Sequence, residues 1–216
     1  MSYKLAIFDL DGTLLDTLDD LADAVNHALN VYNLPLRTKD EVCSFIGNGA
    51  RMLISHAAGE NADADTTLAV FNEFSTYYKT HGDIKTKPYN GVVDMLDKLK
   101  KSGVKLAMLS NKPDYAVQIL NKQYFGDIFD FAAGERAGIP RKPAPDAINA
   151  ILADFNISAT ETVYIGDSDV DIEVAKNADM DCISVSWGFR DANFLREHGA
   201  TCIVASANAL FDEITK

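Results

Sequence analysis

Short, continuous apolar runs recur along the chain, and most of them are followed by a helical pattern. The runs lie at residues 4–8, 105–110, 162–166, 182–186 and 202–205, with a weaker candidate at 129–133. Apolar runs of this length are typical of strands that are buried on both faces of a sheet. Their alternation with helices predicts a Rossmann-like α/β domain, in which helices cover both faces of a parallel sheet. In such a sheet the ligand site lies at the carboxyl ends of the strands.

One region, residues 16–87, interrupts this alternation because it contains no convincing strand. Residues 17–34, 49–59 and 68–82 show helical patterns, and the last two of these segments end at a glycine. We therefore expect a helical domain inserted after the first strand of the α/β domain. The expected boundaries are 1–15 with 88–216 for the α/β core domain and 16–87 for the helical insert.

Composition limits the classes of partner. The net charge of -12 argues against a nucleic-acid partner, which would require a basic face. No run reaches the roughly 18 apolar residues that a membrane span requires, and the N-terminal segment lacks the pattern of a signal peptide. The 3 cysteines and 4 histidines form no metal-binding pattern. We expect a cytoplasmic protein with reduced cysteines.

The first apolar run ends in two acidic residues, Asp9 and Asp11, followed by Gly12. Side chains two residues apart in a strand point to the same face, so the two carboxylates are expected to converge. Like charges at that distance repel each other unless a cation lies between them, and Mg²⁺ prefers oxygen ligands. Gly12 allows a tight turn, and Thr13 offers a backbone N–H and a hydroxyl. A solvated Asp-Gly turn is the alternative interpretation of the same stretch.

A second acidic group, Asp167, Asp169 and Asp171, follows a later apolar run. Its spacing suggests a calcium-binding loop, but Ile172 stands where that loop requires glycine and Ala178 where it requires glutamate. Asp169 and Asp171 suit the start of a helix, where negative charge is favourable. Asp167 is suited to complete a metal site that the first run begins.

Two further polar groups follow other apolar runs. Ser110 and Asn111 stand at the end of the run 105–110, where a hydroxyl and backbone N–H groups before a helix can bind an anion or cap the helix. Lys142 lies between Pro140 and Pro143, whose fixed φ angles stiffen the loop. We expect this lysine to act as a positioned charge, and an exposed lysine in a turn is the alternative.

The order of these groups is more informative than any one of them. Acids for a divalent cation, a hydroxyl and a lysine all fall at the carboxyl ends of separate predicted strands. A parallel sheet brings those ends to one edge. A phosphoryl group with a bound metal ion requires this combination of groups.

With this set of motifs the sequence resembles the haloacid dehalogenase superfamily of phosphatases. The matching motifs are DLDGTLLDT (9–17), LSN (109–111), RKPAPD (141–146) and GDSDVD (166–171). They occur in the order found in the family and span nearly the whole chain, and the insert resembles the family's α-helical cap. Two further segments, FIGNGARML (45–53) and VSWGFRD (185–191), resemble the phosphoglycolate phosphatase branch.

The resemblance implies a role for each matching residue. Asp9 is expected to be the nucleophile that attacks phosphorus and forms an aspartyl-phosphate. Asp11 is expected to protonate the leaving oxygen and then to activate water as a base. Mg²⁺ is expected at a carboxylate oxygen of Asp9, the backbone carbonyl of Asp11 and a carboxylate oxygen of Asp167.

The resemblance also implies which residues bind the substrate. The phosphoryl group is expected to be bound by Gly12, Thr13, Ser110, Asn111 and Lys142, with Asp171 supporting the metal or orienting Lys142. Asn48, Gly49 and Arg51 in the cap are expected to reach the leaving group, and Arg51 is suited to pair with an anionic tail such as a carboxylate. Closure of the cap would exclude bulk water during transfer.

The expected function is that of a Mg²⁺-dependent phosphatase acting on a small phosphorylated metabolite, with phosphoglycolate as the leading candidate. An inorganic pyrophosphatase and a sugar phosphomutase share the same core chemistry and are the alternatives. A dehalogenase and a non-catalytic phosphate-binding protein are disfavoured because neither needs the acid at Asp11. A phosphonate hydrolase is also disfavoured. It relies on a lysine in the cap, and the cap is poor in lysine, with Lys39 the only one between Asp16 and Phe74.

Overall fold

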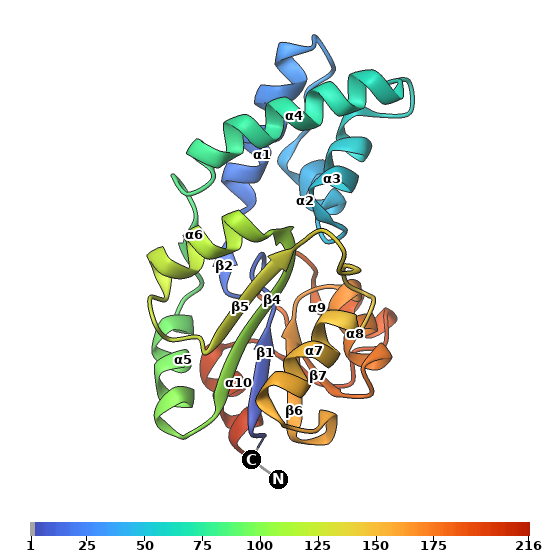
Figure 1. Cartoon of the computed structure of the whole chain (residues 1–216). Helices are drawn as coiled ribbons and strands as arrows, with labels where there is room; N and C mark the ends of the chain where they lie inside the picture. The colour runs from blue at the N-terminus through green and yellow to red at the C-terminus, as the bar shows by residue number, and fades with distance from the viewer. Residues whose placement is uncertain (1–2) are drawn as a thin grey trace. The chain divides into compact units, whose positions relative to one another are not determined.

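A computed structural model describes residues 3–216, which divide into two units (Figure 1). One unit is formed by the residues up to Leu15 together with Pro88–Lys216, and the other by Asp16–Lys87. The two connections between them, β2 (Leu15–Asp16) and β3 (Lys87–Pro88), pair as a two-stranded sheet. The chain thus leaves the first unit after one strand and returns through a paired connection.

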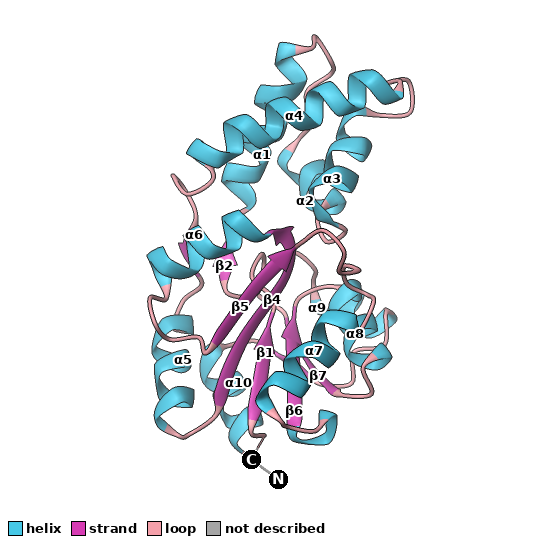
Figure 2. Ribbon diagram, viewed as in Figure 1, coloured by secondary structure: helices cyan, strands magenta, loops and turns pink. Residues whose placement is uncertain are grey.

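The first unit is built on a six-stranded sheet in the order β5-β4-β1-β6-β7-β8, in which every neighbouring pair is parallel. The strands are β1 (Leu5–Phe8), β4 (Lys105–Pro113), β5 (Phe131–Glu135), β6 (Thr162–Gly166), β7 (Asp181–Val185) and β8 (Ile203–Val204). Every apolar run singled out in the sequence contributes a strand, and helices accompany the strands on either side (Figure 2). The predicted α/β fold is therefore confirmed.

Strand residues alternate between the two faces of this sheet, and each face is covered by its own helices. One face carries α5 (Val92–Lys101), α6 (Asp114–Tyr124) and α10 (Ala207–Thr215), and the other carries α7 (Asp146–Phe155) and α8 (Asp169–Asn177). In β1, Ala6 and Phe8 pack on the first face, whereas Leu5 and Ile7 pack on the second. Burying one large apolar side chain stabilises a fold by about 1.5–3 kcal/mol. Burial on both faces therefore fixes the position of β1 and of Asp9, the residue that follows it.

Strand β4 departs from the sequence expectation at its carboxyl end. It continues through Lys112 to Pro113, and α6 begins at Asp114, so Ser110 is not a helix N-cap. The pairing of β4 with β5 shifts register between Leu109 and Pro113. Such a β-bulge changes the direction of side chains locally and is common next to active sites.

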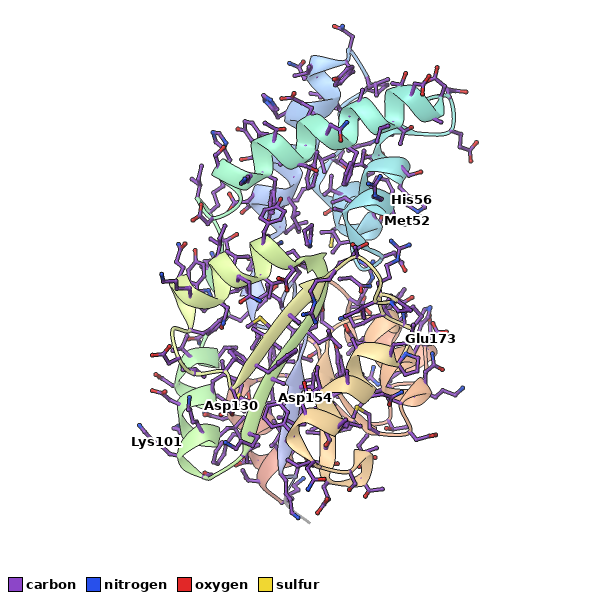
Figure 3. The ribbon with its side chains drawn as sticks, in the orientation of Figure 1. Met52, His56, Lys101, Asp130, Asp154 and Glu173 are labelled. Carbon is purple, nitrogen blue, oxygen red and sulfur yellow. The ribbon has the colours of Figure 1, made fainter. Side chains whose placement is uncertain are left out.

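The second unit consists of four helices: α1 (Leu18–Val31), α2 (Lys39–Phe45), α3 (Gly49–Ala58) and α4 (Ala64–His81). Helix α2 was not expected, although Thr38 and Glu41 form a capping box that marks its start. The helical pattern predicted for residues 17–34 extends past the end of α1, since Tyr32 lies after the helix and is 39% exposed. Met52 and His56 project from the exposed face of α3 (Figure 3).

Two short helices complete the chain, η1 (Ala159–Glu161) and α9 (Ala192–Glu197). The longest helix is α4, with 18 residues. Across residues 3–216, no helix combines the length and the apolar character that crossing a membrane would need.

Candidate active site

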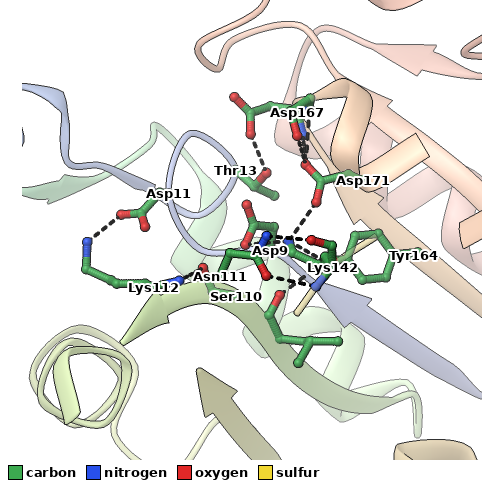
Figure 4. Close-up of polar contacts among 12 residues, drawn as sticks. Asp9, Asp11, Thr13, Ser110, Asn111, Lys112, Lys142, Tyr164, Asp167 and Asp171 are labelled. Carbon is green, nitrogen blue, oxygen red and sulfur yellow. Dashed lines mark hydrogen bonds and ion pairs between the residues drawn. The ribbon is translucent and has the colours of Figure 1, made fainter. Parts of the chain in front are cut away.

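The polar residues singled out in the α/β unit meet where three neighbouring strands end (Figure 4). Strand β1 lies at the centre of the sheet, with β4 and β6 beside it. Asp9 follows β1, Ser110 and Asn111 lie near the end of β4, and Asp167 follows β6. Lys142 comes from the loop between β5 and α7. Parallel strands thus bring residues from distant parts of the sequence to one edge of the sheet.

Three buried carboxylates form the centre of the site. One ligand atom each of Asp9, Asp167 and Asp171 lies within 4.8 Å of the others. Burial, with the charges of Asp171 and Asp11, raises the pKa of Asp9 to about 6 against the opposing effect of Lys142. Burial and the charges of Asp171 and Asp9 also hold the pKa of Asp167 well above its usual range. The negative charges of the three carboxylates therefore exceed the positive charge that Lys142 supplies beside them.

The carboxylate cluster fits a hard divalent cation. Among the described residues, Oδ1 of Asp9 is buried and accepts no hydrogen bond, although Nζ of Lys142 lies 3.0 Å from it. A buried carboxylate oxygen without a hydrogen bond is costly unless a cation binds it. Its proximity to the Asp167 carboxylate places two oxygen donors of the kind that Mg²⁺ prefers next to each other.

Lys142 is held by acidic and polar groups on several sides. Its Nζ lies 2.7 Å from Oδ1 of Asp171 and 3.0 Å from Oδ1 of Asp9, and it donates a hydrogen bond of 2.8 Å to the hydroxyl of Tyr164. Burial alone would lower the pKa of Lys142, but the charges of Asp171 and Asp9 outweigh it and raise that pKa well above its ordinary value. The sequence prediction of a positioned charge agrees with this geometry.

The side chain of Asn111 binds the backbone of Lys142, and its predicted contact with phosphate stays a prediction. Its Oδ1 accepts a hydrogen bond of 2.9 Å from the backbone N–H of Lys142, and its Nδ2 donates one of 3.0 Å to the Lys142 carbonyl. Both polar atoms of the amide therefore hold the backbone of the lysine loop. Ser110 is buried beside it, and its Oγ accepts a hydrogen bond of 3.3 Å from the backbone N–H of Lys112.

Gly12 and Thr13 form the turn after Asp9, and their polar groups are also engaged within the protein. The backbone N–H of Gly12 donates to the Leu15 carbonyl at 2.9 Å, and that of Thr13 donates to the Leu10 carbonyl at 3.3 Å. The Thr13 hydroxyl donates to Oδ1 of Asp167 at 3.2 Å. Gly12 has a φ of 82°, and a Cβ there would lie 2.2 Å from Oδ2 of Asp167. These residues shape the turn, and Thr13 holds Asp167; their predicted contacts with phosphate stay predictions.

The cluster of three carboxylates does not include Asp11, whose side chain contacts a lysine. Its Oδ1 accepts a hydrogen bond of 2.8 Å from Nζ of Lys112, whose side chain is only 3% exposed. Sequence analysis missed Lys112 because it ended the strand at Ser110. The signal was present, since Lys112 lies two residues beyond Ser110 in a strand that continues to Pro113.

Asp171 links the lysine to the loop after β6. Its Oδ1 binds Lys142, while its Oδ2 accepts hydrogen bonds from the backbone N–H groups of Asp167 and Ser168 at 3.2 and 3.1 Å. Ser168 is the N-cap of α8, with Asp169 in the first turn. Asp171 thus orients Lys142, which was one of its two predicted roles.

The residues predicted to bind the leaving group lie together in the helical unit. Asn48 is the N-cap residue of α3 and is exposed, and its side chain makes no capping hydrogen bond. Gly49 is the first residue of the helix. Arg51 is exposed one half-turn later, with its guanidinium carbon 4.4 Å from the centroid of the Phe71 ring.

Comparison with known proteins agrees with this fold and site. The model of a family described as haloacid dehalogenase-like hydrolase matches residues 6–185. A phosphoglycolate phosphatase from Psychrobacter arcticus is 36% identical over 227 residues, covering 100% of this chain and 97% of the relative. Phosphoglycolate phosphatase 1 from Pseudomonas aeruginosa is 31% identical over 210 residues, covering 93% of this chain and 76% of the relative.

A solved structure gives the same result in three dimensions. A protein from Lactobacillus delbrueckii subsp. bulgaricus, provisionally named a phosphoglycolate phosphatase, superposes with a TM-score of 0.95 and 40% identity. The superposition covers 100% of this chain and 99% of that chain. The family model and the Psychrobacter arcticus relative span the motifs at the ends of β1, β4 and β6. The chain therefore belongs to the haloacid dehalogenase-like hydrolase family.

Proposed function

We propose that the chain is a Mg²⁺-dependent phosphatase of small phosphate monoesters and that phosphoglycolate is its substrate. The observation that carries this proposal is the buried centre in which Asp9 contacts the Lys142 ammonium and lies close to the carboxylates of Asp167 and Asp171. A nucleophile flanked by a fixed cation and a metal-binding cluster suits attack on a charged phosphoryl group. The names of the relatives support the choice of phosphoglycolate.

In the proposed mechanism Asp9 is the nucleophile. One of its carboxylate oxygens attacks phosphorus and displaces the alcohol, so that an aspartyl-phosphate forms. The ammonium of Lys142, held by Asp171 and Tyr164, lies beside that carboxylate and offsets the charge on the phosphoryl oxygens. Because these contacts exist before substrate binds, little reorganisation is needed in the transition state.

The metal ion would be held by carboxylate oxygens of Asp9 and Asp167 and by the backbone carbonyl of Asp11. When bound, Mg²⁺ supplies positive charge that offsets the negative charge of the cluster and of the phosphoryl oxygens. Thr13, through its hydrogen bond to Oδ1, keeps the Asp167 carboxylate in place.

Asp11 is proposed to move the proton in both steps. Its carboxyl donates a proton to the leaving oxygen in the first step and takes one from water in the second. The Asp11 carboxylate is only 12% exposed and is held by Lys112 at 2.8 Å. Lys112 thus holds this carboxylate in position just after β1.

Substrate selection is proposed to come from the first turn of α3. Phosphoglycolate carries a carboxylate in addition to its phosphate, and the guanidinium of Arg51 can bind a carboxylate with two parallel hydrogen bonds. Asn48 offers an exposed amide at the same helix start. This arrangement favours an anionic tail over the hydroxyl groups of a sugar phosphate.

The proposal is tested by measuring phosphate release from phosphoglycolate, pyrophosphate, hexose phosphates and nucleoside monophosphates. We expect the highest kcat/KM for phosphoglycolate, and loss of activity in EDTA that added Mg²⁺ restores. Pyrophosphate as the best substrate would identify a pyrophosphatase. Interconversion of hexose phosphates without phosphate release would identify a phosphomutase. Full activity in EDTA would exclude the metal-dependent mechanism.

A further inference from the structure

The segment that follows β7 has no role in the mechanism described so far, yet it is anchored at both ends. Ser186 donates its backbone N–H to the Val204 carbonyl at 3.0 Å. Asp191 caps α9, since its Oδ1 accepts hydrogen bonds from the N–H groups of Asn193 and Phe194 at 2.9 and 2.8 Å. Four residues lie between these anchors, and the first three of them, Trp187–Phe189, are here named the WGF loop.

Each residue of the WGF loop contacts the site. The backbone N–H of Phe189 donates a hydrogen bond of 2.6 Å to Oδ2 of Asp167. The indole Nε1 of Trp187 donates one of 3.0 Å to the carbonyl of Thr13, and the indole also packs against the main core cluster. A Cβ on Gly188 would lie 2.3 Å from the Gly12 carbonyl oxygen and 2.4 Å from Oδ2 of Asp167. The backbone of Gly188 thus lies so close to the Gly12 carbonyl and the Asp167 carboxylate that a side chain at this position would clash with both.

We infer that the WGF loop is a positioning element that sets the orientation of Asp167 for metal binding. Oδ2 of Asp167 is held by the Phe189 N–H and Oδ1 by the Thr13 hydroxyl, so rotation of the carboxylate is restricted from both sides. Trp187 holds the residue that provides the second of these contacts. Groups that orient a metal ligand in this way change metal affinity by about 10–100-fold when they are altered.

The inference rests on the proposed function only in that Asp167 must be a metal ligand. A merely structural role is the competing explanation, because the Trp187 indole covers part of the core. The two explanations differ in what they predict for a folded variant. A structural role changes stability alone, whereas a positioning role weakens cation binding in protein that is fully folded.

The test measures Mn²⁺ binding to the full chain without substrate, by electron paramagnetic resonance of the free ion and by calorimetry. Gly188→Ala is the main variant. The φ of Gly188 lies outside the left-handed range, so alanine introduces the steric conflict with Asp167 and Gly12 without backbone strain. We expect the Kd for Mn²⁺ to rise about 10–100-fold. Trp187→Phe keeps an aromatic ring but removes the hydrogen bond to Thr13, and we expect a rise of about threefold to tenfold.

Two further variants separate the outcomes. Gly199→Ala is the control for a general loss of stability, because Gly199 has a φ of 94° and no atom near the position of a Cβ; its Kd for Mn²⁺ should equal that of the wild type. Asp167→Ala should lose most Mn²⁺ binding, and if it does not, the proposed metal site is wrong. If Asp167→Ala loses binding but folded Gly188→Ala binds Mn²⁺ as the wild type does, the positioning role is overturned. Should Gly188→Ala fail to fold, wild-type affinity in Trp187→Phe overturns it instead.

Discussion

The two regions to which the sequence assigned function are built in opposite ways. At the ends of β1, β4 and β6, Asp9, Lys142 and Asp171 are buried, and Nζ of Lys142 lies 3.0 Å from Asp9 and 2.7 Å from Asp171. In the first turn of α3, Asn48 and Arg51 are exposed, and the arginine rests on the ring of Phe71. In the first region the charged side chains are buried and paired with one another. In the second they are exposed, and the structure gives Arg51 a contact with one aromatic ring.

Under the proposed function, this difference would assign chemistry to the buried region and substrate selection to the exposed one. Buried, mutually held charges stabilise a transition state because they do not reorganise during the reaction. Exposed groups contribute little to the stability of the fold, so the residues at these positions can change to suit a particular substrate. We therefore expect substitutions in the buried centre to affect every substrate and also stability, whereas substitutions in α3 should affect one class of substrate.

The largest effect is expected for Asp9→Asn. The amide has the shape of the carboxylate but cannot form the aspartyl-phosphate, so kcat should fall by about 10³-fold or more for phosphoglycolate and for p-nitrophenyl phosphate alike. Steady-state phosphate release measures the effect. Asp169→Asn is the matched control, because Asp169 lies outside the carboxylate cluster, and it should keep near wild-type activity. Wild-type turnover in Asp9→Asn would refute the mechanism.

The next effect is expected for Lys142→Met, which removes the cation from the buried centre. Asp9 and Asp171 then face each other without compensation, and breaking a buried ion pair in this way costs about 3–5 kcal/mol of stability. Urea denaturation measures the loss, and kcat should fall with every substrate. Lys176→Met, at an exposed position of α8, should change stability by no more than about 0.5 kcal/mol. Equal stability of the two variants would show that the lysine is not the centre of the network.

Sequence patterns predicted the parallel sheet and the location of the site because both depend on regular geometry. Apolar runs mark buried strands, and in a parallel sheet residues that follow neighbouring strands must meet. Asp9 and Asp167 could therefore be placed on the same edge before any contact was known. The tight turn at Gly12 was also predictable, since only a residue that adopts positive φ easily suits it.

The individual contacts could not be predicted, because they depend on irregular features. Strand β4 continues past its apolar run to Pro113 with a shift in register, and Lys112 in this continuation contacts Asp11. The apolar run itself ends at Ser110 and does not show the continuation. Asn111 contacts the backbone of a loop that lies 31 residues away in sequence. Its side-chain chemistry suits phosphate equally well, so only the folded chain shows which partner it binds.

A smaller effect is expected from pH in protein from which metal has been removed with EDTA. Burial raises the pKa of Asp9 to about 6, whereas an unfolded aspartate titrates near pH 3.9. The folded state therefore holds this proton more tightly, and the stability due to this group is lost as pH rises from about 4 to 6. As pH rises across this range, the free energy of unfolding of metal-free Asp9→Asn should increase by about 1–3 kcal/mol relative to that of metal-free wild type.

Urea denaturation of both proteins between pH 4 and pH 8 measures this difference. Asp9→Asn is the matched comparison, since carboxylates distant from Asp9 titrate alike in both proteins and cancel. Asp167 differs, because in the variant the charge of Asp9 no longer raises its pKa. Mg²⁺ added at pH 7.5 should stabilise the wild type more than Asp9→Asn, because it binds the charge that the variant lacks. A difference that shrinks as pH rises would contradict the raised pKa of Asp9.

The smallest and most selective effect is expected for Arg51→Ala. Loss of a charge-assisted contact with the substrate carboxylate should raise KM for phosphoglycolate about tenfold. Turnover of p-nitrophenyl phosphate, which has no carboxylate, should not change. Stability should fall by no more than about 1 kcal/mol, because the stacking of Arg51 on Phe71 is exposed. Arg196→Ala, at an exposed position of α9, should leave KM for both substrates unchanged. If Arg51→Ala lowered turnover of both substrates equally, chemistry and selection would not be divided between the two regions.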